Sequence, residues 1–333
     1  MKKLAVIILN WNGREIMGKF LPSVVAATVG PEVRLIVADN GSTDGSVEWI
    51  KENYPSVEVI EFPENYGFAG GYDKAIREVD AEYSLLLNSD VETPEGWWKP
   101  LLEFMEKTPE AGAVQPKILS YRDKKMFEHA GAAGGMLDAL GYPYARGRIG
   151  SKVEEDKGQY DSSKAVKVAW ASGAAMLVRT RAYVEAGGLD LSFFAHMEEI
   201  DLCWRMMLAG YSIYALLDSV VYHFGGASLA YGNPRKTYLN FRNNLLMLHK
   251  NLPKNKGKRL LLKRRLADTL AFGFFLVKGK WGDCKAVLKA HRDFRKMRKQ
   301  YSDFPDADIL EEIPGTHKYI YLPLKRYGSK KKK

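Results

Sequence analysis

Near its start the chain reads Leu4-Ala5-Val6-Ile7-Ile8-Leu9-Asn10-Trp11-Asn12-Gly13. Six apolar residues without polar alternation, ended by a polar turn, are typical of a strand buried on both faces. The first 120 residues hold four more runs of this kind, at 33–38, 57–62, 83–87 and 113–118. Helical patterns separate them, at 15–28, 46–53, 71–79 and 97–107. This alternation predicts an α/β fold with a mostly parallel, Rossmann-like central sheet flanked by helices.

Polar side chains follow these strands at the points where the strands end. In an open parallel sheet, ligands bind beyond the carboxyl ends of the strands. An Asn or Asp at any one of these points is explained equally well by a turn or a helix cap. Their recurrence after successive strands instead predicts a binding site at one edge of the sheet. The residues concerned are Asn10, Asn12, Asp39, Asn40, Asn65, Asn88 and Asp90.

Two residues are candidate metal ligands. Asp90 closes the segment Asn88-Ser89-Asp90 behind the apolar run 84–87. Carboxylate oxygens suit Mg²⁺ or Mn²⁺, which commonly bridge a protein to a diphosphate. His223 ends the run 220–222 and precedes two glycines, and its imidazole suits Mn²⁺ better than Mg²⁺. An Asx turn and a structural histidine are the alternatives at these two places.

A glycine-rich stretch, Gly67-Phe68-Ala69-Gly70-Gly71, opens one of the predicted helices. The N-terminus of a helix behind such a turn can bind phosphate, and a tight turn without a ligand is the alternative. The first strand is not followed by Gly-x-Gly-x-x-Gly, and the sequence contains no Gly-x-x-x-x-Gly-Lys-Ser/Thr. These two absences disfavour NAD enzymes and P-loop NTPases.

Three carboxylates mark the start of a predicted helix over 199–209. At helical spacing Glu198, Asp201 and Arg205 share one face, while Glu199 points about 100° away. An Asp201–Arg205 pair would be structural, and acids at a helix start also complement the helix dipole. Glu199 is left as the more available general base, because packed like charges raise the pKa of a carboxylate toward neutrality.

Composition and charge divide the chain into two parts. It has 333 residues, of which 46% are hydrophobic, so a disordered chain, a collagen and a disulfide miniprotein are excluded. Its two cysteines fit a reducing cytoplasm. Residues 1–233 hold 23 basic and 32 acidic residues, whereas residues 234–333 hold 27 and 8. No apolar stretch reaches the roughly 18 residues of a membrane-spanning helix.

The remaining segments are expected to follow a looser pattern. Residues 120–165 are rich in glycine and are expected to form long loops with short strands. Further strands are predicted at 166–170, 174–178, 213–217 and 219–222. Helices are predicted at 236–250, 258–277 and 285–300, before a bare basic run at 330–333.

The ordered set of these motifs resembles the family 2 glycosyltransferases, and among them the rhamnosyltransferase-like branch. The resemblance implies the GT-A fold for residues 1–233, with a nucleotide-sugar half of about 1–120 and an acceptor half of about 121–233. Residues 234–333 would then be a C-terminal basic helical appendage. The stretches that carry the resemblance are VIILNWNG from Val6, VADNGSTDGS from Val37, NYGFAGG from Asn65, LLNSD from Leu86, ASGA from Ala171, EEIDLCWR from Glu198 and HFGG from His223.

The resemblance also implies a role for each candidate residue. Asp39 would hold the pyrimidine base beside the Asn10–Asn12 loop. Asn88-Ser89-Asp90 matches the family's Asp-x-Asp motif with Asn in first place, so Asp90 would be the main carboxylate ligand of a divalent metal, with His223 a later ligand. Glu199 occupies the base position of the family's Glu-Asp-x-Asp motif, with Asp201 as the alternative. The nucleotide-sugar-binding set is Asn10, Asn12, Asp39, Asn65, Gly67, Asn88 and Ser89.

The implied reaction is an inverting transfer from a UDP- or dTDP-linked sugar to a hydroxyl of a glycan or lipid-linked glycan, as in surface polysaccharide assembly. Glu199 would take the acceptor proton, and Mn²⁺ or Mg²⁺ would neutralise charge on the leaving diphosphate. Trp170 and Glu198 are candidate acceptor contacts. Aromatic faces stack on sugar faces, although core packing is the commoner role of a tryptophan.

Three interpretations of the basic appendage are open: a solvated helical cap, a membrane-surface module, or a nucleic-acid-binding segment. The second is favoured, because Leu260-Leu261-Leu262, Lys263-Arg264-Arg265 and the aromatic cluster at 272–275 resemble an amphipathic interfacial segment. Nucleic acid ranks last, since no recognition motif accompanies the charge. This interpretation predicts a cytoplasmic enzyme that is peripheral at the inner face of the membrane.

Two other functions compete with the transferase. A sugar nucleotidyltransferase shares the general fold, but the Gly-x-Gly-Thr-Arg-like loop expected after its first strand is missing. A non-catalytic sugar- or lipid-binding module would not need Asp90, His223 and Glu199 together. Incubation with UDP- and dTDP-sugars separates the three, because only a transferase releases UDP or dTDP from them.

Overall fold

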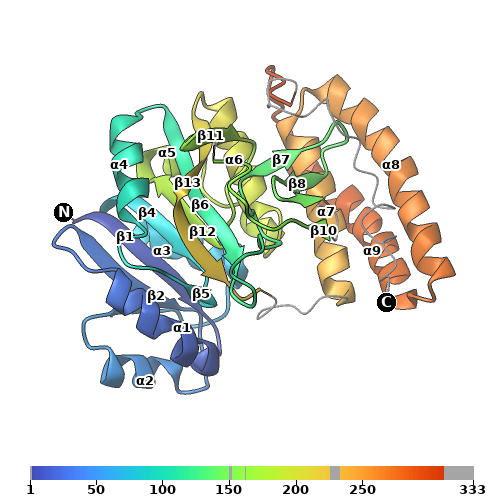
Figure 1. Cartoon of the computed structure of the whole chain (residues 1–333). Helices are drawn as coiled ribbons and strands as arrows, with labels where there is room; N and C mark the ends of the chain where they lie inside the picture. Colours follow the sequence, from blue (N-terminus) through green and yellow to red (C-terminus); the bar gives the residue numbers. More distant parts are fainter. Residues whose placement is uncertain (1, 150–151, 162, 226–232, 311–333) are drawn as a thin grey trace.

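The computed structural model describes residues 2–149, 152–161, 163–225 and 233–310. They form a central sheet with helices on both faces, and a group of C-terminal helices stands beside it (Figure 1). Two features named from the sequence, Gly226 and the basic run 330–333, lie outside the described residues.

The main sheet has nine strands in the order β11-β13-β6-β12-β4-β1-β2-β3, with β5 paired to β13. The pairings β4–β1, β1–β2, β2–β3 and β6–β13 are parallel, whereas β5, β11 and β12 run antiparallel to their neighbours. The mostly parallel sheet and its first five predicted strands are therefore confirmed, with an antiparallel part added. The strands are β1 (Lys2–Asn10), β2 (Val33–Asp39), β3 (Glu58–Glu61), β4 (Ala81–Leu87), β5 (Val91–Glu92), β6 (Ala111–Ser120), β11 (Ala165–Val168), β12 (Ala175–Arg179) and β13 (Ser212–His223).

One long strand replaces two predicted ones. The runs 213–217 and 219–222 both belong to β13, whose register with β6 shifts between Leu216 and Val220. Pro116 of β6 lies opposite Leu216, and a proline has no N–H to donate to the ladder. The strand bulges there and continues to His223, so it carries this histidine to the edge of the sheet where Asp90 lies.

Helices connect the strands as the sequence pattern predicts, with ends that differ by a few residues. The helix α3 begins at Gly67 rather than at residue 71, and α4 begins at Lys99 rather than at 97. The helices are α1 (Arg14–Ala27), α2 (Ser46–Asn53), α3 (Gly67–Glu78), α4 (Lys99–Lys107), α5 (Thr180–Glu185), α6 (Glu198–Leu208), α7 (Pro234–Asn251), α8 (Lys254–Val277) and α9 (Trp281–Met297), with short 3-10 turns η1 (Leu191–Phe193) and η2 (Arg298–Gln300).

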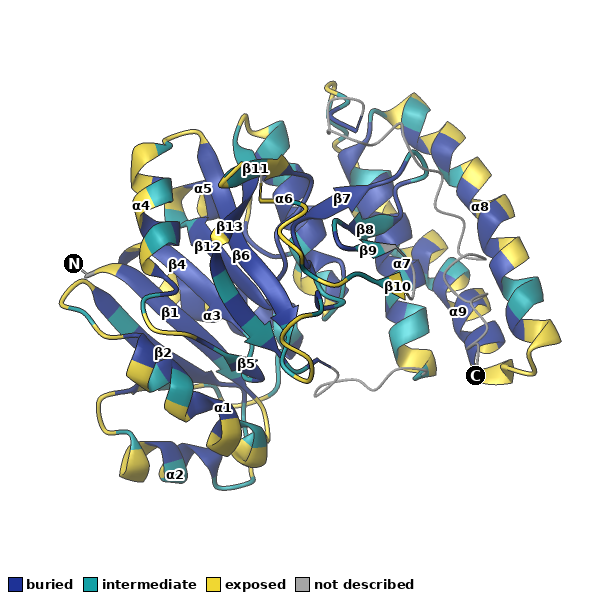
Figure 2. Ribbon diagram, in the orientation of Figure 1, coloured by how far each residue is buried: buried dark blue, intermediate teal, exposed yellow. Residues whose placement is uncertain are grey.

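The first strand shows why its sequence lacks polar alternation. Ala5 and Ile7 belong to the hydrophobic cluster on one face of the sheet, and Leu4, Val6 and Ile8 belong to the cluster on the other face. Helices α1 and α4 cover the second face, while α3, α5, α6 and α7 cover the first. The strands are buried between these two layers (Figure 2).

A small antiparallel sheet lies in the region that the sequence predicts as long loops with short strands. Its order is β10-β9-β8-β7, and the Asn244 side chain of α7 donates to the carbonyl oxygen of Gly141 between β7 and β8 at 2.8 Å. The strands are β7 (Gly135–Leu137), β8 (Pro143–Ala145), β9 (Arg148–Ile149) and β10 (Lys152–Val153).

The C-terminal helices are not equally independent of the sheet. Leu245, Leu246 and Leu248 of α7 are buried in the main core, whereas Phe275 of α8 and Val287 of α9 belong to a separate, smaller cluster. Helix α7 is thus part of the body that holds the site, and α8 and α9 join the same core through residues such as Leu260 and Phe294. None of the helices in the described ranges offers a long enough apolar segment to cross a membrane.

Candidate active site

Side chains tie together the carboxyl ends of β1 and β2. The parallel register places Asn10 opposite Asp39, and Asn10 Nδ2 donates to Asp39 Oδ1 and to Ser46 Oγ, both at 2.8 Å. The backbone N–H of Ser42 donates to the other oxygen of Asp39 at 2.8 Å. Both oxygens of Asp39 therefore order the loop between β2 and α2. Asn10 Oδ1 is buried without a hydrogen-bond partner among the described residues.

Asn12 links the loop after β1 to the loop after β2 near the protein surface. It has a left-handed φ of 48°, and its side-chain oxygen accepts the N–H of Thr43 at 2.7 Å. Trp11, which no sequence pattern singles out, is 57% exposed beside it. An exposed indole at the carboxyl end of a parallel strand offers a flat face at the edge where ligands bind.

The glycine-rich turn before α3 is not an open phosphate cradle. The N–H groups of Phe68 and Ala69, at the start of α3, both donate to the carbonyl oxygen of Phe194, at 2.9 and 3.1 Å. The side-chain oxygen of Asn65 accepts the N–H of Gly67 at 2.8 Å. The predicted contacts of Asn65 and Gly67 with a nucleotide sugar are therefore not supported, because the donors at this helix N-terminus are already paired.

The second group of site residues lies where β4 and β13 end. His223 Nε2 lies 3.0 Å from Asp90 Oδ1 and 3.3 Å from Asn88 Nδ2. The other oxygen of Asp90 accepts the N–H of Gly225 at 3.2 Å. Asp90 and His223 are buried, while Asn88 and Ser89 are partly exposed. The structure thus brings together two residues that are 133 positions apart and that the sequence predicts as metal ligands.

Glu128 is a site residue that sequence reasoning missed. Its Oε2 lies 3.1 Å from His223 Nδ1, and its side chain is buried. Burial raises the pKa of Glu128, but His223 and the N–H of Ala130 outweigh it and hold the pKa at about 2. Burial lowers the pKa of His223, but Asp90 and Glu128 raise it to about 10. No motif surrounds Glu128 in the loosely patterned region 120–165, so the sequence held no signal for it.

This donor set fits a divalent cation. Asp90 Oδ1 and His223 Nε2 lie 3.0 Å apart as an ion pair, and a divalent cation bound by both would displace the proton of Nε2, because metal ligands bind in their deprotonated form. A metal-binding histidine usually donates its other ring N–H to a carboxylate, as Glu128 allows. Within the described residues no three or more His, Cys, Asp or Glu side chains form a complete metal cage. Further ligands would have to come from substrate or water, as is usual for Mg²⁺.

The start of α6 carries two adjacent buried carboxyl groups. Oε2 of Glu198 and Oε2 of Glu199 are both buried without a hydrogen-bond partner within the described part of the chain. Burial, followed by the charge of Glu199, raises the pKa of Glu198 well above its usual value. Burial also raises the pKa of Glu199, to about 7, although nearby backbone N–H groups oppose the shift. Glu199 is the more exposed of the two, so it combines a base-like pKa with access.

Asp201 is a structural anchor rather than an available base, which corrects the alternative drawn from the sequence. Its side chain is fully buried, and Oδ2 pairs with Arg205 at 2.8 Å and with Lys250 at 3.0 Å. Oδ1 accepts from Asn251 Nδ2 at 2.8 Å. Both oxygens are committed to α6 and α7, so neither is free to take a proton from a substrate.

The loop in front of Glu198 has an unusual backbone. Phe194, His196 and Met197 have φ values of 64°, 70° and 74°, in the left-handed region that non-glycine residues rarely adopt. Gly67 permits the close approach of this loop to α3, since a Cβ there would lie 2.6 Å from the Phe194 ring. Side-chain donors from α7 hold the loop from the other side: Asn243 Nδ2 donates to the carbonyl oxygens of Phe193, Ala195 and His196 at 3.0, 3.0 and 2.7 Å.

The turn 171–173 connects the two groups of acids. The backbone N–H of Asn88 donates to the carbonyl oxygen of Ala174 at 3.0 Å. A Cβ on the adjacent Gly173 would lie 3.2 Å from the Phe68 ring and 3.8 Å from Cβ of Glu199. The strand end with Asn88 and the helix start with Glu199 therefore border the same edge of the sheet.

Neither of the two predicted acceptor contacts, Trp170 and Glu198, is open to an acceptor in this structure. Trp170 is 5% exposed, its indole N–H donates to the carbonyl oxygen of Met136 at 2.9 Å, and its ring packs onto Gly135. The prediction of a sugar platform at Trp170 is therefore wrong, because no face of the ring is free. Glu198 lies beside Glu199 but is 4% exposed, so its carboxyl group is not open to an acceptor in this conformation.

Comparison with known proteins agrees with this arrangement. Residues 5–158 match the sequence model of the family described as Glycosyl transferase family 2. The chain is 29% identical, over 66% of its length and 76% of the relative, to the N-acetylglucosaminyl-diphospho-decaprenol L-rhamnosyltransferase of Mycobacterium tuberculosis. It is 25% identical, over 62% of its length and 77% of the relative, to the rhamnosyltransferase WbbL of Escherichia coli.

Its fold is similar to that of GalNAc-T7, solved with UDP, GalNAc and Mn²⁺, with a TM-score of 0.59 at 15% identity. The match covers 77% of this chain and about half of that one, 49%. This likeness confirms the GT-A fold, with a mostly parallel central sheet and additional C-terminal helices. The protein is a glycosyltransferase: its residues 5–158 match glycosyl transferase family 2, and the chain is similar to the rhamnosyltransferases.

Proposed function

We propose that the protein transfers a deoxyhexose, with inversion at the anomeric carbon, from a UDP- or dTDP-linked donor to a lipid-linked glycan. The support for the sugar and the acceptor class is the likeness to two rhamnosyltransferases, one of which is named for an N-acetylglucosaminyl-diphospho-decaprenol substrate. The observation that carries the reaction is Glu199, whose Oε2 is buried without a hydrogen-bond partner among the described residues and whose pKa is raised to about 7. Such a group is half-deprotonated near neutrality, which suits a general base.

The carboxylate of Glu199 would accept the proton of the acceptor hydroxyl while the hydroxyl oxygen attacks the anomeric carbon. Burial and the charge of Glu199 raise the pKa of Glu198, so the two adjacent carboxyl groups disfavour each other's ionisation. The left-handed loop 194–197 and its anchor Asn243 would hold the start of α6 at a fixed place relative to the donor. Orientation of this kind is a large part of the rate acceleration of enzymes.

Asp90 and His223 are the proposed ligands of Mn²⁺ or Mg²⁺, with Glu128 orienting the imidazole. A divalent cation held there would neutralise the charge that develops on the leaving diphosphate. Asn88 and Ser89, on the partly exposed turn beside it, are the proposed contacts of the donor phosphates or sugar. Asp39 and Asn10 order the loops that follow β1 and β2. Asn12 and Trp11, on the first of these loops, are the proposed contacts of a pyrimidine base.

A transfer assay tests the proposal directly. UDP- and dTDP-sugars are incubated with Mn²⁺ and a lipid-linked N-acetylglucosaminyl diphosphate, release of UDP or dTDP is followed, and the anomeric configuration of the product is read by NMR. We expect nucleotide release that depends on acceptor, metal and Glu199. Glu103→Gln, a change of an exposed acid on α4, is the matched control for Glu199→Gln. A product that retains the donor configuration, or unchanged turnover in Glu199→Gln, would refute the base assignment.

We also propose that the enzyme works in the cytoplasm at the inner face of a membrane. A lipid-linked acceptor is held in a bilayer, so an enzyme that uses it has to reach the membrane surface. The division into a catalytic part at 1–233 and a basic appendage at 234–333 belongs to this proposal, with α7 as the helix that joins the two.

A further inference from the structure

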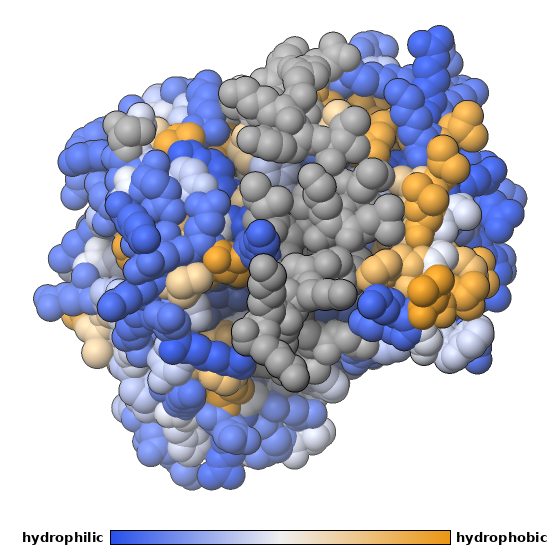
Figure 3. All heavy atoms as spheres, turned by 45° about the vertical axis from the view of Figure 1, so that its right-hand side comes forward, coloured by the Kyte–Doolittle hydropathy of each residue, from blue (hydrophilic) through white to orange (hydrophobic). Residues whose placement is uncertain are grey.

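Helix α8 has a row of leucines that faces away from the protein. Leu262, Leu266 and Leu270 are 69%, 68% and 48% exposed, and Val277 is 86% exposed. Spacings of four and seven residues place these four side chains within one quarter of the helix circumference, over four turns. Figure 3 shows apolar residues gathered on this side of the molecule, next to hydrophilic ones. We call these four residues the outer stripe.

The opposite face of α8 is the face that packs against the rest of the protein. Leu260, Ala267, Ala271 and Phe275 are buried against the rest of the protein. A surface helix normally needs one apolar stripe, with polar residues on its other face. Helix α8 has two, on opposite sides, and the outer stripe contributes nothing to the core. Contiguous exposed apolar patches of this kind mark surfaces that bind a partner or a membrane.

The charge around the outer stripe identifies the partner. Residues 254–297 contain 14 Lys and Arg and three Asp, and Lys263 and Arg265 border the stripe directly. The three acids are not available to a basic partner: Asp268, Asp283 and Asp293 all accept hydrogen bonds from side chains of the protein itself. An apolar stripe bordered by cations matches the surface of an anionic bilayer, where acyl chains lie beneath phosphate groups.

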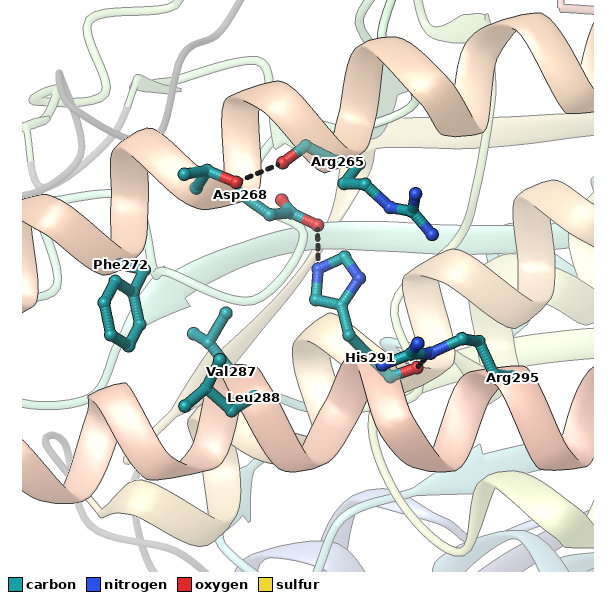
Figure 4. A pocket seen from close by; sticks show the side chains of 8 residues that line it. Arg265, Asp268, Phe272, Val287, Leu288, His291 and Arg295 are labelled. Carbon is teal, nitrogen blue, oxygen red and sulfur yellow. Dashed lines mark hydrogen bonds and ion pairs between the residues drawn. The ribbon is translucent and has the colours of Figure 1, made fainter.

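A groove between α8 and α9 adds a place for a lipid headgroup. It has a volume of about 440 Å³, and its lining residues Arg265 and Thr269 are the chain neighbours of Leu266 and Leu270 in the outer stripe. One end of the groove is apolar and is lined by Phe272, Val287 and Leu288. The other end is polar and is lined by Arg265, His291 and Arg295 (Figure 4). The three polar residues also line a second groove of about 320 Å³.

The two arginines of the groove have no acidic partner within the part of the chain that the structure describes. No ion pair of Arg265 or Arg295 occurs among the described residues, and Arg295 only donates to the carbonyl oxygen of His291 at 3.3 Å. His291 differs, since its Nε2 lies 3.0 Å from the buried Asp268. Two guanidinium groups from different helices, next to an apolar surface, are suited to a phosphate that carries acyl chains.

We propose that the outer face of α8, together with the α8–α9 groove, docks on an anionic phospholipid bilayer. The outer stripe enters the boundary between headgroups and acyl chains, and Arg265 and Arg295 bind lipid phosphate. The proposal names the surface that would bring the active site to a lipid-linked acceptor, but it does not depend on the transfer reaction, because docking is measured without donor or acceptor.

Vesicle co-sedimentation of the full chain tests the proposal. One set of vesicles is phosphatidylcholine alone, and the other is an equimolar mixture of phosphatidylcholine and phosphatidylglycerol. We expect binding to the mixed vesicles that falls with added salt, and weak binding to the neutral ones. The triple change Leu262→Ser, Leu266→Ser, Leu270→Ser and the double change Arg265→Glu, Arg295→Glu should each lower binding at least about tenfold.

Matched controls lie on the catalytic body. Leu191→Ser with Val184→Ser removes exposed apolar residues, and Lys51→Glu with Lys107→Glu makes the same change in net charge; neither should alter binding. Melting temperatures identify any variant that fails to fold, and the lipid and salt dependence of the unmodified protein tests the proposal without variants.

Equal binding to both vesicle types, or full binding by the folded leucine variant, would overturn the docking proposal. Loss of vesicle binding on adding inorganic phosphate at constant ionic strength would show that the groove takes free phosphate instead of a lipid headgroup. Transfer to a water-soluble acceptor analogue should be unchanged in both variants, so a failure of docking is distinct from a failure of the proposed chemistry.

Discussion

Asn243 Nδ2, on α7, lies 2.7 Å from the carbonyl oxygen of His196, two residues before the paired glutamates at the start of α6. The same amide nitrogen donates to two more carbonyl oxygens of this loop. Asn243 is fully buried, and the loop it holds contains three left-handed non-glycine residues. A strained backbone of this kind persists only where its surroundings over-determine it. A helix outside the family-matched residues 5–158 therefore fixes the segment that carries the proposed base.

Replacement of Asn243 tests this relationship. In Asn243→Ala the three carbonyl groups lose a buried donor, which should cost about 1–3 kcal/mol of unfolding free energy. We expect kcat to fall at least about tenfold with little change in donor KM, because the loop positions the base and not the nucleotide. Steady-state kinetics and denaturant unfolding measure the two effects. Asn53→Ala, which removes one exposed bond to Trp49, is the control and should change neither. A variant with normal kcat would show that the loop needs no anchor.

The pH dependence of the reaction follows from Glu199. Its pKa is raised to about 7, and a general base has to be deprotonated. The rate should therefore rise with pH and reach a plateau above about pH 7. Glu199→Gln should abolish transfer while donor binding persists. The pH–rate profile of kcat and calorimetry with the donor test these statements, and a rate that is flat between pH 5 and 8 would contradict the assignment.

The same pKa has an opposite consequence for stability. Glu199 binds its proton more tightly in the folded protein than in the unfolded chain, because burial raises its folded pKa above the ordinary value of 4.5. Its contribution to stability is thus present below pH 4.5 and is lost as pH rises to about 7. Glu199→Gln, which cannot ionise, should melt at a higher temperature than the parent at pH 8 and show no such gain at pH 4. A lower melting temperature at pH 8 would indicate that the carboxylate is stabilised by a partner.

Glu128 is expected to act on the metal through His223. Glu128→Gln keeps the size of the side chain but weakens the hold on His223 Nδ1, which lies 3.1 Å away. Loss of an outer-shell carboxylate typically lowers metal affinity about 10–100-fold. Titration of Mn²⁺ followed by electron paramagnetic resonance measures this without turnover. Asp90→Asn should weaken binding further, and Glu92→Gln, a nearby acid that pairs with Lys124 at the surface, should leave it unchanged. Equal Mn²⁺ affinity in Glu128→Gln and the parent would remove Glu128 from this role.

Asp201 and Glu199 can be told apart by what each variant loses. Asp201→Asn leaves the buried ends of Arg205 and Lys250 without their shared anion. Breaking a buried ion pair on one side usually costs about 3–5 kcal/mol, so a large drop in unfolding free energy is expected. The folded fraction should keep the apparent pKa of the parent in its pH–rate profile. If that pKa disappears with Asp201→Asn and not with Glu199→Gln, Asp201 is the base.

Much of the fold was predictable because its signals are local. Four of the first five predicted strands are mostly apolar runs, because burial on both faces of the sheet requires that pattern. The run 57–62, which contains Glu58 and Glu61, forms the partly exposed edge strand β3. The boundary between the runs 213–217 and 219–222 was misplaced because a bulge depends on the partner strand. Here that partner is Pro116, about a hundred positions earlier in the chain.

The site was predictable in part for the same reason. Asn10, Asp39 and Asp90 stand at carboxyl ends of strands, which the sequence marks clearly. Trp170 was misassigned because adjacency in sequence to a motif does not tell which way a ring points. The phosphate cradle at Gly67 is not supported, because the N–H groups of Phe68 and Ala69 donate to the carbonyl oxygen of Phe194, a residue from a distant loop.

The sequence by itself determined the order of strands and helices, the polar edge of the sheet and the basic, helical character of the last hundred residues, because these depend on periodicity, composition and turn residues along the chain. Tertiary structure alone decided which acids have partners. Lys250 and Asn251 of α7 bind Asp201, and Glu128 of a loop without a sequence pattern contacts His223, while Oε2 of Glu199 has no hydrogen-bond partner in the described part of the chain. A carboxylate becomes an anchor, a ligand support or a base according to what packs against it, and packing joins residues that the sequence keeps far apart.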